Sequence, residues 1–225
     1  ILSLAEEIAA APADSWPMYR GSSSLTGLSK SKLSTDLKQL WSFKAEEGIH
    51  STAAIVDNKV FVGCDDGNLY ALDFKTGKKI WEFKTEDIVE SAPLVKDGRV
   101  YFGSSDGFVY ALSAKNGKLH WKFETEDRVL GAPNFFKPKD KKSKESIIVG
   151  SYDFKLYSFD PISGKNNWSY ETSNYINGSP AVFSGRTAFG GCDALLHVID
   201  LKKGSKEKQI DAEAYIIGSA AVVND

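Results

Sequence analysis

The sequence is poor in the residues that carry redox and metal chemistry. Its 225 residues include two cysteines, one methionine and three histidines, and neither cysteine lies in a Cys-x-x-Cys or Cys/His cluster. This scarcity argues against a disulfide framework, a zinc site or a thiol-exchange centre. We expect Cys64 and Cys192 to be buried and to pack as small hydrophobic side chains.

The sequence also lacks long apolar runs and an excess of either charge. No stretch approaches the roughly 20 apolar residues of a membrane-spanning helix, so we expect no transmembrane segment. With 28 basic and 30 acidic residues the net charge is -2, which gives no basic field for nucleic acid, and no nucleic-acid partner is expected. A chain that is 42% hydrophobic and 26% charged is expected to fold rather than remain disordered.

An internal repeat of about 40 residues organises the chain. The spacings between the repeating tryptophans are 40, 40 and 47 residues, and those between the repeating glycines are 40, 47 and 40 (Trp41, Trp81, Trp121, Trp168; Gly63, Gly103, Gly150, Gly190). The longer spacing comes from a lysine-rich insertion at 138–145 that leaves the register on both sides intact. Four complete repeats are predicted at about 49–85, 89–125, 129–172 and 176–210, with partial strands at both ends.

Each repeat has the pattern of four short strands joined by turns. In the second repeat the expected strands are Ala92–Val95, Val100–Gly103, Phe108–Leu112 and Leu119–Phe123, separated by Gly and Asx residues that favour turns. The period is too short for βαβ units, and no helical periodicity is present. The sequence therefore predicts an all-β fold, a β-propeller of four-stranded antiparallel blades.

A motif within the repeat identifies the type of propeller. The pattern G-x-x-D-x-x-[LV]-Y-x-[LF]-x-x-x-x-G-K-x-x-W occurs at 63–81, 103–121 and 150–168. It resembles the PQQ-like, or quinoprotein-type, propeller repeat, and the segments Trp16–Gly21 and Leu25–Gly27 resemble the lead-in of that family. The resemblance implies a lead-in at 1–37, a propeller at 38–225, and a ring of seven or eight blades of which this chain forms part.

The resemblance also assigns structural roles within each repeat. It implies that the repeating tryptophans dock adjacent blades, and an indole suits this role because it buries a large apolar area while its N–H needs a partner. We expect the repeating aspartates and glycines to form turns (Asp66, Asp106, Asp153, Asp193; Gly77, Gly117, Gly164, Gly204). The fourth repeat departs from the pattern, since His197 replaces the tyrosine and Gln209 lies near the expected tryptophan.

Both ends of the repeat array are expected to be incomplete blades. Leu40–Phe43 matches Ile80–Phe83, a fourth strand, and Ile216–Asn224 matches Val89–Asp97, a first strand with its turn. Unpaired strands leave open sheet edges. We therefore expect the chain to be part of a longer polypeptide, or to associate with itself through these edges.

Propeller topology sorts the turns onto two faces of opposite charge. The face with the turns between strands two and three, and with the links between blades, is expected to be acidic (Glu46, Glu47, Asp65, Asp66, Glu86, Asp87, Glu90, Asp106, Glu126, Asp127, Asp153, Asp193). The opposite face is expected to be basic and includes the insertion lysines, a possible partner-binding group (Lys137, Lys139, Lys141, Lys142, Lys144). Polar turns alone explain this distribution; the alternative is a dipolar protein that steers different partners to its two faces.

Two functions stay open at this point. The adjacent cysteines and the acidic and amide calcium ligands of quinoprotein dehydrogenases have no counterparts here, and no nucleophile or metalloprotease motif is present, so we expect neither PQQ nor calcium. The leading hypothesis is a non-enzymatic protein-binding scaffold of the BamB-like kind, in envelope or outer-membrane protein assembly. The small residues that end segment 1–13 also suggest an exported, periplasmic protein. The alternative is a PQQ-dependent dehydrogenase or ligand-sensing domain whose site lies in blades outside this chain.

Overall fold

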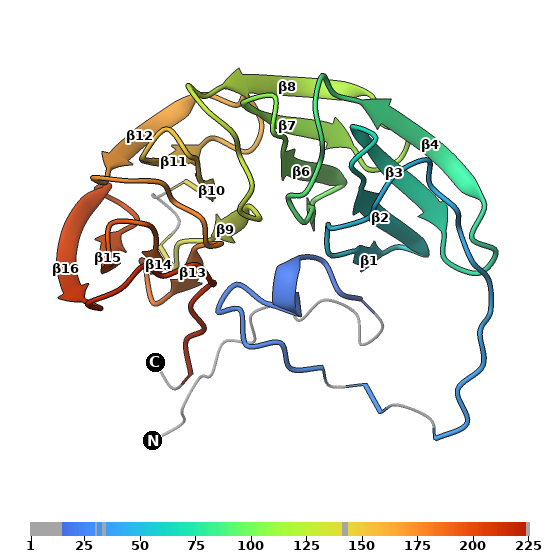
Figure 1. Cartoon of the computed structure of the whole chain (residues 1–225), viewed down its shortest axis with the longest axis horizontal. Helices are drawn as coiled ribbons and strands as arrows, with labels where there is room; N and C mark the ends of the chain where they lie inside the picture. Colours follow the sequence, from blue (N-terminus) through green and yellow to red (C-terminus); the bar gives the residue numbers. More distant parts are fainter. Residues whose placement is uncertain (1–14, 30, 33–34, 141–143, 224–225) are drawn as a thin grey trace.

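Four small sheets form an arc in the computed structural model, which describes residues 15–29, 31–32, 35–140 and 144–223 (Figure 1). Each sheet has four antiparallel strands in sequence order, so each is a meander built from one repeat. The first strand of each sheet lies on the inner side of the arc and the fourth on the outer side. The predicted propeller fold with four complete blades is confirmed.

The strand bounds follow the repeat. Blade 1 contains β1 (Ala54–Val56), β2 (Lys59–Gly63), β3 (Asn68–Asp73) and β4 (Lys79–Lys84). Blade 2 contains β5 (Leu94–Lys96), β6 (Arg99–Gly103), β7 (Phe108–Ser113) and β8 (Leu119–Glu124). Blade 3 contains β9 (Asn134–Phe136), β10 (Ser146–Gly150), β11 (Lys155–Phe159) and β12 (Asn166–Glu171). Blade 4 contains β13 (Ala181–Phe183), β14 (Arg186–Gly190), β15 (Leu195–Asp200) and β16 (Ser205–Asp211).

The tight turns explain why the meander forms where it does. Between β5 and β6, Asp97 and Gly98 both have positive φ, 50° and 73°, and Lys96 pairs directly with Arg99. This is the two-residue hairpin whose backbone twist matches that of antiparallel strands. The Asp-Gly pair therefore sets the register of blade 2.

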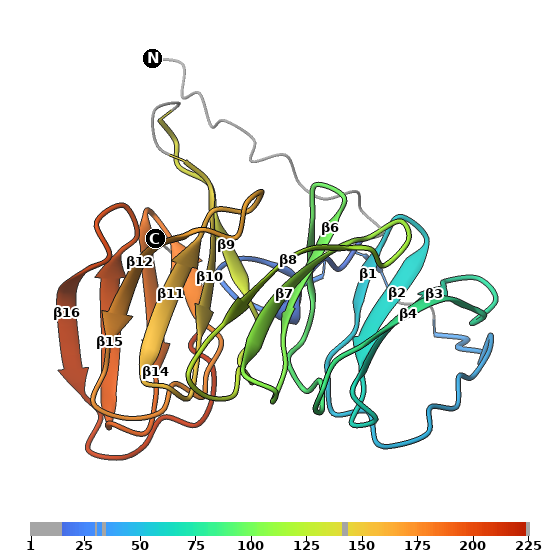
Figure 2. The same cartoon turned by 90° about the horizontal axis from the view of Figure 1, so that it is seen from above.

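The hydrophobic core lies in the seams between the blades. The second and third strands of blades 1 to 3 are buried almost throughout, β15 of blade 4 is only partly buried, and β4 and β12 consist of exposed and half-buried residues. Phe61 of blade 1 and Phe102 of blade 2 belong to one buried cluster, and Tyr101 of blade 2 and Phe159 of blade 3 belong to the next. Blades covered by neighbours on both sides need apolar residues on both faces of a strand. Stacking of the sheets is visible in Figure 2.

The described part of the lead-in crosses the inner side of the arc and bonds to every blade. Trp16 forms an antiparallel bridge with Ile55 of β1, at 2.7 and 2.8 Å. The Ser23 carbonyl accepts hydrogen bonds from the Val182 amide of blade 4 and the Asn134 side chain of blade 3, both 2.7 Å. The Pro17 carbonyl accepts from Val95 of blade 2. This segment, which includes the 3₁₀ turn η1 (Tyr19–Gly21), ties the inner strands together.

The two predicted partial strands are not formed, which corrects the expectation from the sequence. Residues 38–50 contain no strand, although exposure alternates from Trp41 to Glu46 as it does along β4. Residues 216–223 also contain no strand, and Asn224 lies outside the described residues. A strand requires a hydrogen-bonded neighbour, and no described segment supplies the inner partners of 40–43 or the second strand beside 216–223.

Candidate functional site

Two sets of turns define two opposite faces. The Thr85 amide, which starts the link from β4 to β5, donates to the Gly67 carbonyl of the β2–β3 turn at 2.8 Å. The links and the turns between the second and third strands of the blades therefore share one face. The Phe74 amide of the β3–β4 turn bonds to the Asn58 carbonyl of the β1–β2 turn at 3.0 Å, so these turns share the other. We call the face with the links the turn face and the opposite face the lysine face. The residues predicted to form the acidic face lie in turns and links of the turn face, and the lysines predicted for the basic face lie at the turns of the lysine face.

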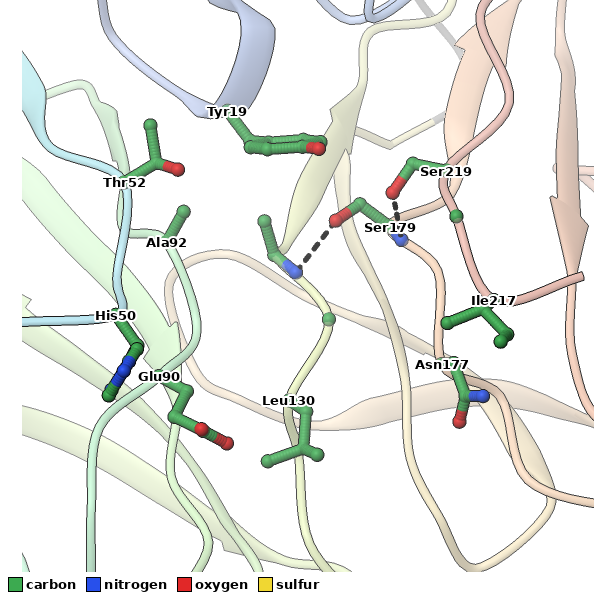
Figure 3. Close-up of a pocket in the computed structure, with 13 residues that line it drawn as sticks. Tyr19, His50, Thr52, Glu90, Ala92, Leu130, Asn177, Ser179, Ile217 and Ser219 are labelled. Atoms are coloured by element: carbon green, nitrogen blue, oxygen red, sulfur yellow. Dashed lines mark hydrogen bonds between the residues drawn. The ribbon is translucent and has the colours of Figure 1, made fainter. Parts of the chain in front are cut away.

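A cavity of about 320 Å³ lies at the inner ends of the links between blades. Its wall is built from the same position of five successive links (His50, Glu90, Leu130, Asn177, Ile217). Figure 3 shows these side chains at one level, a second level of small residues beyond them, and Tyr19 of the lead-in at the far end. The lead-in therefore contributes one end of the cavity, and the links contribute its wall.

Hydrogen bonds between neighbouring links hold this wall in place. Ser91 Oγ donates to the Gly131 carbonyl at 3.0 Å, and the equivalent Ser51 donates to the Ser91 carbonyl at 3.1 Å. On the other side Ser179 Oγ accepts from the Ala132 amide at 2.9 Å, and the Ser179 amide bonds to Ser219 Oγ at 2.8 Å (Figure 3). The backbone that presents the variable side chains is thus fixed from blade to blade.

The polar side chains at the cavity are mainly neutral (Tyr19, His50, Thr52, Asn177, Ser179, Ser219), with one acidic residue. His50 Nδ1 lies 2.7 Å from a carboxylate oxygen of Asp65, and Asn177 Nδ2 donates to Cys192 Sγ at 3.1 Å. Glu90 is the single carboxylate among the lining residues, which include no lysine or arginine.

Cys64 is buried, but Cys192 is only partly buried, so the prediction that both cysteines are buried is wrong for Cys192.

These lining residues do not fit the quinone cofactor that the repeat type implies. PQQ carries three carboxylates, which cationic side chains bind most strongly, whereas the cavity lining offers neutral donors but no lysine or arginine, and Glu90 adds a charge of the same sign. Calcium requires six to eight oxygen ligands. In the described ranges no three His, Cys, Asp or Glu side chains are grouped as a metal site requires.

The repeating aspartates lie in the turn between the second and third strands of each blade, and they accept hydrogen bonds from residues of the same turn and the third strand. Asp66 accepts a hydrogen bond from the Asn68 amide at 2.9 Å and one from the Tyr70 hydroxyl at 2.6 Å. Asp106 and Asp153 make the same two kinds of contact, with the tyrosine bonds at 2.7 and 2.5 Å. Burial alone raises the pKa of Asp66, but the bonds from Tyr70 and Asn68 outweigh it and lower that pKa. Burial and the bond to Asp66 raise the pKa of Tyr70.

These shifts predict loss of stability at both ends of the pH range. A lowered Asp pKa gives stability that is complete above the ordinary value near 4 and declines as pH falls through the folded-state value. A raised Tyr pKa gives stability that is complete below about pH 10 and declines as pH rises further. We expect the urea midpoint of the wild-type chain to stay constant with pH between these limits. Asp66→Asn is expected to reduce the decline of the midpoint at acid pH, and Tyr70→Phe is expected to reduce its decline at alkaline pH. Tyr215→Phe, at a residue 67% exposed, is the control, and slopes identical to wild type in both test variants would contradict the assignment.

The repeating tryptophans lie at the seams. Each indole N–H donates to a backbone carbonyl after the third strand of the following blade, at 2.8–3.4 Å (Trp41 to Phe74, Trp81 to Ala114, Trp121 to Pro161, Trp168 to Leu201). Each indole also lies against the repeat glycine of that blade, where an added Cβ would come within 2.5–2.8 Å of the ring (Gly77, Gly117, Gly164, Gly204). The structure thus brings together two sets of residues that are distant in sequence. Their contribution to docking energy stays a prediction for substitution to test.

Blade 4 compensates for its departures from the repeat. By register, Lys208 rather than Gln209 occupies the tryptophan position, because it pairs with Val198 as Trp121 pairs with Ala111. His197 is buried, and its Nε2 lies 2.8 Å from Asp193 Oδ2. Its Nδ1 lies 3.2 Å from the Tyr170 hydroxyl, where the equivalent residue in blade 2 is Phe123. The exchange of Tyr for His is therefore matched by an added hydroxyl.

The insertion lies on the lysine face, between β9 and β10. Lys137 pairs with Glu145 at 3.4 Å, and Lys202 of blade 4 reaches Asp140 of the insertion at 2.5 Å. Lys139 and Lys144 are within the described residues, whereas Lys141 and Lys142 lie outside them. Part of the positive charge is therefore neutralised locally, and the partner-binding role of this group stays a prediction.

Sequence reasoning missed the cavity wall. Its residues occupy one variable position within an otherwise regular link: Glu90 follows Val89 and precedes Ser91-Ala92-Pro93, and Asn177 follows Ile176 and precedes Gly178-Ser179-Pro180. The available signal was one position of the link that varies, from His to Glu, Leu, Asn and Ile, between neighbours that repeat from link to link. Variable side chains on a constant backbone are typical of recognition surfaces.

Comparison with known proteins settles the family. The model of the family described as outer membrane protein assembly factor BamB matches residues 32–214. The chain belongs to the BamB family. No curated protein matches the chain significantly. No helix within the part of the chain that the structure describes is long and apolar enough to cross a membrane.

Solved structures share the fold of this BamB-family chain. It is similar to BamB from Moraxella catarrhalis, with 21% identity and a TM-score of 0.64 over 76% of this chain and 52% of that one. It is also similar to quinohemoprotein alcohol dehydrogenase from Comamonas testosteroni, with 18% identity and a TM-score of 0.73 over 92% of this chain and 42% of that one. The computationally designed protein Ika8 is similar too, with 18% identity and a TM-score of 0.66 over 76% of this chain and 52% of that one. The chain spans about half the length of these structures or less. A fold common to an assembly factor and a dehydrogenase does not by itself decide between binding and catalysis.

Proposed function

We propose that this chain acts as a non-enzymatic scaffold that binds protein partners through its turn face, in the periplasmic assembly of outer-membrane proteins. The observation that carries the proposal is the set of variable side chains that successive links place around one cavity mouth, His50, Glu90, Leu130, Asn177 and Ile217. Membership of the BamB family supports the assembly role. His50 is paired with Asp65 at the cavity, but within the described residues no hydroxyl or thiol is hydrogen-bonded to its ring, and no motif supplies a nucleophile or a fitted cofactor.

The turn face has the physical properties of a protein-binding surface. Leu130 is a half-buried apolar residue of the cavity wall, and the surrounding turns carry the acidic residues predicted from the sequence. Apolar side chains within a charged rim favour specific association, in which the apolar part supplies affinity and the charges steer encounter. The fixed link backbone keeps this surface preorganised, which lowers the entropy lost on binding.

Site-specific photo-crosslinking in cells tests the proposal. A photoreactive residue in place of Glu90 is expected to crosslink to a protein of the outer-membrane assembly machinery, and one in place of Lys203, on the lysine face, is expected to give far less product. If only a photoreactive residue in place of Lys139 gives crosslinks, the partner binds at the insertion lysines and not at the turn face. Absence of protein crosslinks from all three positions contradicts the scaffold role, as does dye reduction after addition of PQQ and calcium to the purified chain.

A further inference from the structure

A second cavity, of about 170 Å³, lies in the seam between blades 3 and 4, beside turns of the lysine face. We call it the seam pocket. Its polar lining comes from both blades and surrounds one indole (Lys144, Ser146, Ser158, Asn167, Lys202; Trp168). Its volume is below the roughly 300 Å³ of pockets that hold drug-sized ligands, so it admits a small molecule or an ion.

Blade 3 forms the seam pocket because it departs from the repeat along one row of paired residues. In blades 1 and 2 the row across the second, third and fourth strands is an aromatic residue, an alanine and the repeat tryptophan (Phe61, Ala71, Trp81; Tyr101, Ala111, Trp121). The two rings of each row lie within 5.9 Å of each other, between centroids. The row of blade 3 is Ile148, Ser158 and Trp168. The smaller Ile148 leaves space beside the indole, and Ser158 adds a hydroxyl to it.

A second position of blade 3 also exchanges a large side chain for a serine. Ser146 starts β10 and pairs with Phe136, and the equivalent position of every other blade holds a long cationic side chain (Lys59, Arg99, Arg186). Residues two apart on a strand share a face, so Ser146 lies on the same face as Ile148. Ile148 belongs to a buried cluster with Phe189 of blade 4, and this face is therefore the one that meets blade 4.

The Ser158 hydroxyl points to a bound group. Ser158 is 0% exposed, and its Oγ has no hydrogen-bond partner among the described residues. A buried hydroxyl without a partner destabilises a fold, and native proteins seldom keep one unless a ligand or an ordered water completes its bonding. The alanine of blades 1 and 2 avoids this cost at the same position. A hydroxyl that the fold does not require thus lines the seam pocket.

The charges at the seam pocket favour an anion. Lys144 and Lys202 line it, and none of its described lining residues is acidic. Two carboxylates lie near these lysines. Asp160 accepts three hydrogen bonds, at 2.8–3.0 Å, from residues of its own turn, whereas Asp140 forms an ion pair with Lys202. An anion of higher charge than a carboxylate is therefore needed to compete with Asp140.

The number of donors identifies the class of anion. Two ammonium groups, two hydroxyls and one side-chain amide line the seam pocket, which is more than the two oxygens of a single carboxylate need. A phosphate group carries close to two negative charges at neutral pH and at least three strong acceptor oxygens. Lysine binds phosphate as a point charge, without the planar geometry that arginine imposes.

We propose that the seam pocket binds a phosphate group, either as the free ion or as a small phosphate monoester. Lys144 and Lys202 neutralise its charge, the hydroxyls of Ser146 and Ser158 donate to its oxygens, and the Trp168 indole forms one wall. The site lies away from the turn face and does not depend on the scaffold function.

Nuclear magnetic resonance of the full chain tests the proposal, because the five tryptophans give five indole N–H signals. Inorganic phosphate at constant ionic strength is expected to shift the Trp168 signal saturably, and Trp168→Phe identifies that signal. Ser158→Ala and Lys202→Gln are each expected to weaken phosphate binding by about tenfold or more. Ser158→Ala introduces the residue that blades 1 and 2 hold, so it is expected to fold.

Two further variants and a stability measurement control for indirect effects. Lys203→Gln removes a neighbouring lysine that does not line the seam pocket, and wild-type affinity is expected. Asp140→Asn is expected to tighten binding by about twofold to fivefold, because it removes the competing carboxylate. In phosphate-free buffer the urea midpoint of Ser158→Ala is expected to equal or exceed that of wild type.

Three results overturn the proposal: no saturable shift of the Trp168 signal, an equal shift with acetate, or wild-type phosphate affinity in Ser158→Ala. A lower urea midpoint of Ser158→Ala in phosphate-free buffer also contradicts it, because the hydroxyl would then already be bonded within the chain. Glycerol 3-phosphate distinguishes the two sources of the phosphate group. Tighter binding of glycerol 3-phosphate than of inorganic phosphate supports a monoester, and the reverse order supports the free ion.

Discussion

Replacing Trp121 with alanine is expected to lower the free energy of unfolding by about 3 to 5 kcal/mol, the range for truncation of a buried large aromatic residue. The indole is 8% exposed and lies 5.9 Å, between ring centroids, from both Tyr101 of its own blade and Phe159 of the next. Its N–H donates to the Pro161 carbonyl at 3.0 Å, a bond that alanine also removes. Urea denaturation followed by circular dichroism measures the change.

Trp41 provides the matched control for this substitution. It makes the same two contacts, with the Phe74 carbonyl and Gly77, but belongs to a segment that is not paired into a sheet. Trp41→Ala is therefore expected to lower stability less than Trp121→Ala. An unchanged midpoint for Trp121→Ala, or an equal loss in both variants, is incompatible with a docking role for the seam indole.

Adding a methyl group on the other side of the same seam is expected to lower stability by about 2 to 4 kcal/mol. Gly164 has a φ of 71°, and a Cβ there would lie 2.5 Å from Cδ2 of Trp121. Gly164→Ala therefore combines left-handed backbone strain of about 1 kcal/mol with overpacking of about 1 to 3 kcal/mol. Thermal or urea unfolding of the variant gives the total.

Gly98→Ala separates the two contributions. Gly98 has almost the same φ, 73°, but a Cβ added there would have no atom within 4 Å, so the substitution introduces the strain without the overlap. A loss of about 1 kcal/mol is expected. If Gly164→Ala costs no more than Gly98→Ala, the indole does not press against the glycine in solution.

The interior of the repeat was predictable because local signals agree there. In blade 2 the predicted strands match the observed ones to within two residues, since the Asp97-Gly98 turn, the apolar runs and the period all point to the same meander. The ends were not predictable in the same way. Leu40–Phe43 has the sequence of a fourth strand, but strand formation depends on a partner, and pattern alone does not supply one.

The candidate sites needed the structure. The cavity combines residues from five links with Tyr19 of the lead-in, and no local window of sequence contains more than one of these links. The conformation of Phe154 was hidden for a different reason: the residue occupies a position where blades 1 and 2 have glycine, and only its φ of 72° shows that the turn kept its left-handed conformation around a bulky residue. The indole and glycine sets, by contrast, were visible as sequence periods, although their contact was not.

The central claim is that each indole joins its blade to the glycine of the next, and a double-mutant cycle tests it most directly. Free energies of unfolding are measured for wild type, Trp121→Ala, Gly164→Ala and the double variant. Because the overlap disappears when the ring is absent, Gly164→Ala in the Trp121→Ala background is expected to cost only the backbone strain of about 1 kcal/mol, which gives a coupling energy of about 1 to 3 kcal/mol. Additive losses, with coupling within about 0.5 kcal/mol of zero, would contradict the account.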